Sequence, residues 1–457
     1  MGDRERTAES VAAIRAAAGA ATRYVEGLDA RRAAPDAPML AGLDALDGPL
    51  PDEGSDAAEV VRLLDEAGSP ATVATAGPRY FGFITGGVVP AAAGAHVLAA
   101  AWGPNRGVGA MSPVAARLET IAGGWALDLL GLPRDAGVGF TTGATMANLT
   151  GLAAARHRLS ARAGWDAGAA GLAGAPPLTV VVGDEVHVSL LKGLALLGLG
   201  RSRVVRVPAD AQGRLDAAAL PALDDRTILC LQAGNVNSGA FDPFAAAVAK
   251  ARDAGAWVHV DGAFGLWALA SPALRPLAEG VAGADSWATD AHKWLNVPHD
   301  SGLAIVRDRA ALHAAMGVTA AYLATGTRDG SAFVPEISRR ARGIEVWAAL
   351  RSLGRTGLAE ALDRCCLLAR RFAEGLAGHG FAILNDVVLN QVLVAFGDDE
   401  RTRRTIAAVQ RDGTCWCGGT VWQGRAAMRV SVSSFATTGA DVEASIAAIA
   451  RAAAATN

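Results

Sequence analysis

The chain has little lysine and no excess of positive charge. Its 457 residues include 42 arginines and lysines, of which only Lys192, Lys250 and Lys293 are lysine, and the formal net charge is -3. No cluster of basic residues stands out, which argues against nucleic acid as a main partner. A chain so poor in lysine draws attention to the sequence around each lysine.

Cysteines are few, and long apolar runs are absent. The five cysteines form one adjacent pair, one pair separated by a single residue and one isolated thiol: Cys365 and Cys366, Cys415 and Cys417, and Cys230. This odd set is unlike a secreted disulfide framework, so reduced thiols are expected. No second Cys/His pair supports a metal site at Cys415 and Cys417. Because neither a secretory leader nor a membrane-spanning run is visible, we expect a cytoplasmic protein that does not bind a membrane.

Lys293 lies in the segment Asp290-Ala291-His292-Lys293-Trp294. By itself this segment is equally consistent with a surface lysine beside a buried histidine. The run 256–260 is typical of a strand and places Asp261 at its carboxyl end, where open α/β sheets carry their chemistry. A lysine and a carboxylate in one cleft indicate pyridoxal phosphate (PLP), whose aldehyde forms a Schiff base with lysine and whose pyridine nitrogen pairs with a carboxylate. A helix-capping role for Asp261 is the alternative.

Two upstream segments could complete such a site. The stretch 139–145 enters a helix-like run, and its small residues would let backbone N–H groups approach a phosphate. It contains neither the P-loop nor the dinucleotide glycine pattern, and an ordinary strand-to-helix turn fits it as well. The strand-like run 179–182 leads to His187 at the start of another helix-like run. That imidazole could stack on a flat cofactor ring, or it could be a core or capping residue.

These segments, in this order, resemble the PLP-dependent group II amino acid decarboxylases, which include glutamate, histidine and aromatic amino acid decarboxylases. The resemblance covers roughly residues 70–450. It extends through segments 78–83, 112–113 with Glu119, 239–243, 338–340 and Trp347. It implies fold type I of the aspartate aminotransferase superfamily: an α/β domain with a large, mostly parallel, seven-stranded sheet, and a smaller C-terminal α+β domain. It also implies a homodimer, because the family's N-terminal helices pack across a dimer.

The resemblance implies a role for each motif residue. Lys293 would form the Schiff base and His187 would stack on the ring, both as catalytic residues. Asp261 would pair with the pyridine nitrogen. The remaining cofactor-binding positions would be Gly143, Ala144, Thr145, Ala263 and His292, with Asn148 as a weaker candidate.

Three further residues are candidates for substrate binding. Arg429 lies in a strand-like segment, 428–433, and its guanidinium could bind a substrate carboxylate in a bidentate manner or form a surface ion pair instead. Phe81 and Phe83 could line an aromatic pocket or pack in the core. The sequence does not identify which amino acid is the substrate.

One departure from the family affects the expected reaction. Family members carry a tyrosine in a mobile loop, thought to protonate the quinonoid carbon, and backward alignment from Ser338 places Gly330 opposite it. Tyr322 is the only tyrosine in this loop and comes earlier. In the family, loss of the tyrosine opposite Gly330 is associated with a switch towards aldehyde-forming oxidative chemistry. From the resemblance as a whole we expect decarboxylation of an L-amino acid to its amine, through a Lys293 Schiff base and a quinonoid intermediate. An aldehyde synthase, another PLP enzyme such as an aminotransferase, and a catalytically silent scaffold are the alternatives.

The sequence pattern suggests three parts. Residues 1–69 are expected to form an N-terminal helical segment, residues 70–310 a large PLP-binding domain, and residues 311–457 the mobile loop and the small C-terminal domain. Strand and helix patterns alternate through the middle part, as in a parallel sheet covered by helices.

Overall fold

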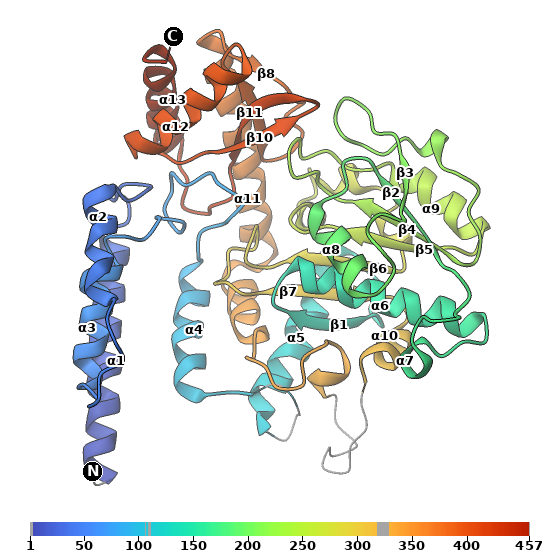
Figure 1. Cartoon of the computed structure of the whole chain (residues 1–457), viewed down its shortest axis with the longest axis horizontal. Helices are drawn as coiled ribbons and strands as arrows, with labels where there is room; N and C mark the ends of the chain where they lie inside the picture. The colour runs from blue at the N-terminus through green and yellow to red at the C-terminus, as the bar shows by residue number, and fades with distance from the viewer. Residues whose placement is uncertain (1–2, 106, 108–110, 318–328, 457) are drawn as a thin grey trace.

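A seven-stranded sheet forms the centre of the computed structural model, which describes residues 3–105, 107, 111–317 and 329–456 (Figure 1). The strand order is β1-β7-β6-β5-β4-β2-β3. The strands are β1 (Gly137–Thr141), β2 (Thr179–Gly183), β3 (Val205–Val207), β4 (Thr227–Gln232), β5 (Trp257–Asp261), β6 (Ser286–Asp290) and β7 (Gly302–Val306).

Strand direction gathers the strand ends at one edge. Strands β2 to β6 are paired in parallel, whereas β7 is antiparallel to both of its neighbours, β6 and β1. Strand β1 therefore runs in the same direction as β6, and all strands except β7 end at the same edge. The prediction of a mostly parallel seven-stranded sheet is confirmed.

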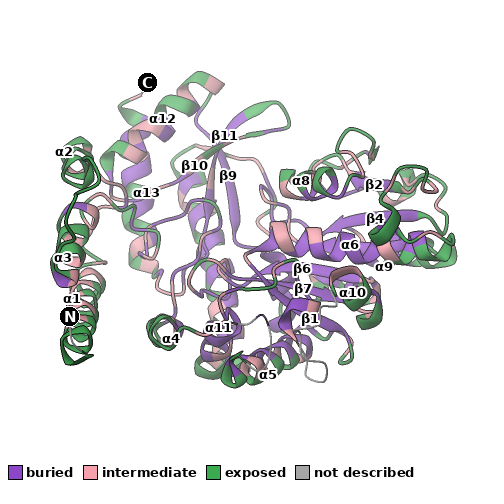
Figure 2. Cartoon of the chain, turned by 60° about the horizontal axis from the view of Figure 1, so that its bottom comes forward, coloured by how far each residue is buried: buried purple, intermediate pink, exposed green. Residues whose placement is uncertain are grey.

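Helices cover both faces of this sheet, which explains its continuous apolar strands (Figure 2). Alternate strand residues such as Val180 and Val181 belong to different core clusters, one on each face. One face packs against α6 (Ala144–Arg162), α8 (Val188–Leu196) and α10 (Arg309–Met316). The other packs against α5 (Pro113–Leu130), α9 (Phe244–Asp253) and the first part of α11 (Gly343–Gly378).

A smaller antiparallel sheet follows α11, whose helical geometry is interrupted at Gly354 (φ 61°). Its order is β10-β11-β9-β8, and helices α11, α12 and α13 pack against it or one another. The bounds are β8 (Ala382–Ile383), β9 (Gln391–Ala395), β10 (Gly418–Trp422), β11 (Arg425–Ser431), α12 (Asp399–Asp412) and α13 (Gly439–Ala454). The strand expected at 428–433 is thus shifted towards the N-terminus, because a tight turn at Gln423 and Gly424 joins β10 to β11.

The N-terminal helices stand beside the two sheets (Figure 1). Helix α1 (Asp3–Glu26) packs on α3 (Ala57–Gly68), yet no residue of α1 is buried. The remaining elements are α2 (Ala37–Ala41), α4 (Pro90–Trp102), α7 (Ala167–Ala170), and the 3-10 helices η1 (Gly42–Leu46), η3 (Ala217–Ala219), η4 (Gly265–Ala270), η5 (Arg275–Ala278), η6 (Val281–Gly283) and η7 (Gly330–Ala332). None of the helices in the described ranges is long and apolar enough to cross a bilayer.

Candidate active site

The residues predicted to bind the cofactor lie at or just beyond the common edge of the large sheet. Gly143 follows β1, His187 follows β2, and Asp261 ends β5. Strand β6 ends at Asp290, three residues before Lys293. The fold therefore brings together residues that are up to 150 positions apart in the sequence.

Two N–H groups hold the Asp261 carboxylate at the end of β5. The side chain is buried, its Oδ1 accepts a hydrogen bond from the Ala263 backbone N–H (3.2 Å), and its Oδ2 accepts one from Asn148 Nδ2 (3.0 Å). Asn148 was predicted only as a weaker candidate. Its position one turn inside α6 brings it directly onto the carboxylate.

Behind Asn148 lies a buried chain of hydrogen bonds. Asn148 Oδ1 lies 2.9 Å from His259 Nε2, His259 Nδ1 lies 2.8 Å from Ser286 Oγ, and Trp257 Nε1 donates to Ser286 Oγ (2.9 Å). An amide oxygen only accepts, so His259 donates from Nε2 and its Nδ1 accepts from the serine hydroxyl. In this series of hydrogen bonds every residue therefore donates to the next one towards Asp261. Each hydrogen bond polarises the one that follows it. Burial lowers the pKa of His259 to about 3, so the ring is neutral.

His259 was not among the predicted site residues, although a signal for it was present. It lies two residues before Asp261 on the same strand, so both side chains point to the face covered by α6. Trp257, four residues before Asp261 on the same strand, carries the same signal. Ser286 carries none, because it lies on β6 and its role depends on contacts between the two strands.

Gly143 allows a close approach at the N-terminus of α6. A Cβ atom there would lie 3.0 Å from both Asp290 Oδ1 and His292 Cε1. The Ala144 backbone N–H donates to Asp290 Oδ1. The N–H groups of Thr145 and Met146, in the first turn, have no intrahelical acceptor and point out of the helix end, which favours anions.

Lys293 lies beside the same carboxylate. Its Nζ is 3.1 Å from Asp290 Oδ2, and both side chains are largely shielded from solvent. Asp290 was not among the predicted site residues, although it belongs to the predicted segment. One carboxylate therefore contacts both the lysine amine and the helix terminus.

His292 has a fixed orientation. Its Nδ1 accepts a hydrogen bond from the Ser301 backbone N–H (3.1 Å), which leaves the proton of the neutral ring on Nε2, 3.6 Å from Asp290 Oδ1. The ring of His299 lies against it, with 4.1 Å between the ring centroids. Burial lowers the pKa of His292.

His187 caps α8, as the predicted helix start requires. Its Nδ1 accepts from the Ser189 backbone N–H (3.3 Å) and contacts Ser189 Oγ (2.7 Å). Burial lowers the pKa of His187, the charge of Asp261 opposes this change, and the charges of Lys293 and Arg429 add to it. His187 therefore lies within electrostatic range of these three groups.

Arg429 brings a cation from the small sheet to this region. Its side chain donates a hydrogen bond to the Val236 carbonyl oxygen (3.3 Å), and burial lowers the pKa of its guanidinium. No ion pair with a carboxylate is found for Arg429 within the described ranges. A shielded guanidinium without a carboxylate partner is suited to binding an anion.

The two phenylalanines predicted to line a substrate pocket are placed differently. Phe81 is fully buried and packs edge-on against Phe372, with 4.9 Å between centroids. Phe83 is largely exposed and stacks on Trp416. In this chain Phe81 is a core residue, and a substrate-lining role for either side chain stays a prediction.

The loop residues predicted to affect protonation are only partly described. Tyr322 lies outside the described residues. Gly330, which was predicted to lie opposite the family's tyrosine, is buried at the start of η7 and offers no side-chain proton.

Comparison with known proteins agrees with this geometry. Residues 50–397 match the family model described as the pyridoxal-dependent decarboxylase conserved domain. Since the match covers most of the chain, the protein belongs to this family of PLP-dependent carboxy-lyases, and PLP is its cofactor. The predicted resemblance to the group II decarboxylases is confirmed.

Individual relatives cover most of the chain. An aromatic-L-amino-acid decarboxylase from Bacillus atrophaeus is 27% identical over 343 residues, which is 70% of this chain and 68% of the relative. A phenylacetaldehyde synthase from Arabidopsis thaliana is 26% identical over 420 residues, 84% of each protein. The crystal structure of Oryza sativa TDC with PLP and tryptamine superposes with a TM-score of 0.89 at 23% identity, covering 100% of this chain and 99% of the other. The last comparison shows the fold alone.

Proposed function

We propose that this enzyme decarboxylates an L-amino acid to the corresponding amine, with PLP held covalently by Lys293. The observation that carries the proposal is the grouping of the Lys293 amine, the Asp261 carboxylate and the N-terminus of α6 at one edge of the sheet. When bound, the pyridine ring accepts the electron pair released as a bond to the substrate α-carbon breaks.

The donor set of this site fits the cofactor. The free N–H groups of Thr145 and Met146, the close approach that Gly143 allows and the Nε2 proton of His292 suit its phosphate. Asp261, supported by the donors behind Asn148, suits the protonated pyridine nitrogen. Ala263 holds that carboxylate through its backbone N–H.

His187 supports catalysis by presenting a ring in a fixed orientation. Its Nδ1 is occupied at the start of α8, so Nε2 is the protonated nitrogen of the neutral ring. The lowered pKa keeps the ring neutral near pH 7. We propose that this ring stacks on the cofactor and helps to orient it.

Arg429 is our candidate for the group that binds a substrate carboxylate. The bond aligned perpendicular to the cofactor ring is the one that breaks, so the residue that holds the α-carboxylate selects decarboxylation over loss of the α-proton. The support is the half-buried Arg429 guanidinium, which has no carboxylate partner in the described residues. It lies within electrostatic range of His187, and it comes from the small sheet, whereas Lys293 follows a strand of the large one.

An aldehyde synthase is the second candidate. Two points support it. Gly330, which we expect opposite the family's proton-donating tyrosine, has no side chain that could donate a proton. One relative is a phenylacetaldehyde synthase. If the substrate carbon is not protonated promptly, its oxidation by dissolved dioxygen competes with amine release; dioxygen is reduced to hydrogen peroxide, and water then releases the aldehyde and ammonia.

We also propose a homodimer that forms through the N-terminal layer, and a cytoplasmic location. The homodimer is supported by α1 and α3, where Val11, Ile14, Leu63 and Leu64 are exposed in the single chain. Large apolar side chains exposed on neighbouring helices are suited to a protein interface. The location rests on the five free cysteines.

The test combines a spectrum with a turnover panel. Wild-type protein supplied with PLP should show a visible absorbance band of the bound cofactor, which Lys293→Ala abolishes and the matched control Lys250→Ala retains. Lys250 is exposed on α9. Amino acids are then supplied in turn, and carbon dioxide, amine, ammonia and hydrogen peroxide are measured. Carbon dioxide with amine supports decarboxylation, ammonia and peroxide with carbon dioxide support the aldehyde synthase, and no product from any amino acid would overturn both.

A further inference from the structure

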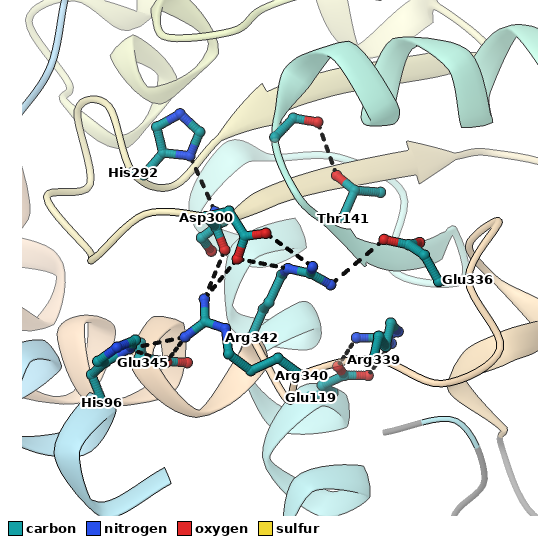
Figure 3. Close-up of polar contacts among 12 residues, drawn as sticks. His96, Glu119, Thr141, His292, Asp300, Glu336, Arg339, Arg340, Arg342 and Glu345 are labelled. Atoms are coloured by element: carbon teal, nitrogen blue, oxygen red, sulfur yellow. Dashed lines mark hydrogen bonds and ion pairs between the residues drawn. The ribbon is translucent and has the colours of Figure 1, made fainter. Parts of the chain in front are cut away.

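We propose that Asp300, clamped by Arg340 and Arg342, is a positioning residue that acts through His292 on the phosphate end of the cofactor site (Figure 3). The inference rests on the proposed function, because it assumes that His292 faces the phosphate. Asp300 itself does not touch Lys293 or Asp261.

The clamp consists of several charge-assisted hydrogen bonds on one residue. Arg342 donates from Nε to Asp300 Oδ1 (3.2 Å) and from Nη2 to Oδ2 (3.0 Å), a bidentate arrangement. Arg340 Nη2 donates to Oδ1 and to the Asp300 backbone oxygen, both at 2.9 Å. The side chain and the peptide of Asp300 are therefore both held.

The arginines of the clamp are themselves anchored. Arg340 Nη1 donates to the buried Glu345 carboxylate at the start of α11 and lies 2.9 Å from His96 Nδ1 on α4. The neighbouring Arg339 forms a second bidentate pair with Glu119 on α5, at 2.8 and 3.1 Å. Contacts with α4, α5 and α11 thus fix the segment 339–342, which carries the two arginines that bind Asp300.

Both neighbours of Asp300 contact His292. The Ser301 backbone N–H donates to His292 Nδ1, and the Ser301 carbonyl accepts from the His292 backbone N–H (3.2 Å). On the other side, the His299 ring lies against the His292 ring. A displacement of Asp300 would alter both contacts and turn the Nε2 proton of His292 away from Gly143 and Asp290.

The exposure of Asp300 argues that the clamp serves geometry more than stability. Its side chain is 43% exposed, whereas that of Arg342 is 7% exposed. Ion pairs with a solvent-exposed partner contribute little to the free energy of unfolding. Bidentate pairing, in contrast, fixes the orientation of a carboxylate closely, and here the carboxylate adjoins both contacts of His292.

The test is PLP affinity, measured by titrating the purified apoenzyme with PLP and following the absorbance and protein fluorescence. We expect Asp300→Asn to weaken PLP binding about tenfold, as supporting hydrogen bonds around a bound group commonly do. Asp300→Glu, which keeps the charge, should lose less. The matched control is Asp128→Asn, since Asp128 on α5 also pairs with two arginines, Arg134 and Arg355, and is 38% exposed. Equal PLP affinities in Asp300→Asn and Asp128→Asn would overturn the proposal.

A double-mutant cycle tests the route through His292. If Asp300 acts through that ring, Asp300→Asn should change PLP affinity little in a His292→Asn background. The same tenfold loss in both backgrounds would refute the route. Urea unfolding of each apo variant checks folding, and Arg342→Lys, which loses the bidentate geometry, replaces Asp300→Asn if that variant does not fold. Because PLP binding is read without substrate, a wild-type protein that binds PLP but releases no product counts against the proposed function and leaves this test intact.

Discussion

The neutral His259 behind Asp261 should make the stability of the apoenzyme depend on pH. Its pKa is about 3 in the folded chain, because the ring is fully buried, and about 6.5 in an unfolded chain. Below pH 6.5 the unfolded state binds a proton that the folded state does not bind. The stabilisation is therefore complete above pH 6.5 and is lost as the pH falls towards 3.

The size of the effect follows from linkage. One proton of difference changes the free energy of unfolding by about 1.4 kcal/mol per pH unit, which amounts to about 2 kcal/mol between pH 6.5 and 4.5 because the unfolded histidine is only half protonated at the start. His259→Gln should remove this slope. Its amide can still donate towards Asn148 Oδ1, so the variant keeps one contact of the original ring.

The assay is urea unfolding of the apoenzyme at pH 7.5, 6.5, 5.5 and 4.5, at one protein concentration for the wild type and for His259→Gln. His187 and His292 also titrate with lowered pKa values, but both remain in the variant and cancel in the difference between the two curves. Between pH 6.5 and 4.5 the wild type should lose about 2 kcal/mol more of its free energy of unfolding than His259→Gln loses. Curves that run parallel over this range would refute the neutral, buried assignment of His259.

Three further substitutions test other parts of the site. Arg429→Lys keeps a positive charge but loses the bidentate guanidinium, so steady-state kinetics should show a KM for the amino acid that is roughly tenfold higher, with the PLP absorbance unchanged. An unchanged KM would contradict the carboxylate-binding role. Asn148→Ala leaves Asp261 and His259 without their shared partner, and urea unfolding should show a loss of about 2 kcal/mol together with weaker PLP binding. Gly143→Ala places a methyl group 3.0 Å from Asp290 and His292, so PLP titration should give a higher dissociation constant. An unchanged dissociation constant would mean that PLP binding does not require the absence of a side chain at residue 143.

Much of the site could be predicted because its residues lie in local patterns. Lys293 and His292 are adjacent. Asp261 ends one short apolar strand and His187 follows another, and this pattern indicates both the strand and the edge where it ends. The small-residue entry to α6 is likewise visible over seven positions. Strand boundaries were less certain, as β11 shows, because pairing with β10 and β9 decides where it begins and ends.

The sequence by itself determined the alternation of strands and helices, because hydrophobic periodicity records it. The order of the motif residues, with the resemblance to the group II decarboxylases that it carries, indicated the sheet class and the cofactor. Only the tertiary structure decided which polar groups complete the site. Asn148 and Asp261 are 113 positions apart, Arg340 and Asp300 are 40 apart, and Arg339 and Glu119 are 220 apart. Contacts at such separations depend on how strands and helices pack in three dimensions, and no local pattern in one chain encodes them.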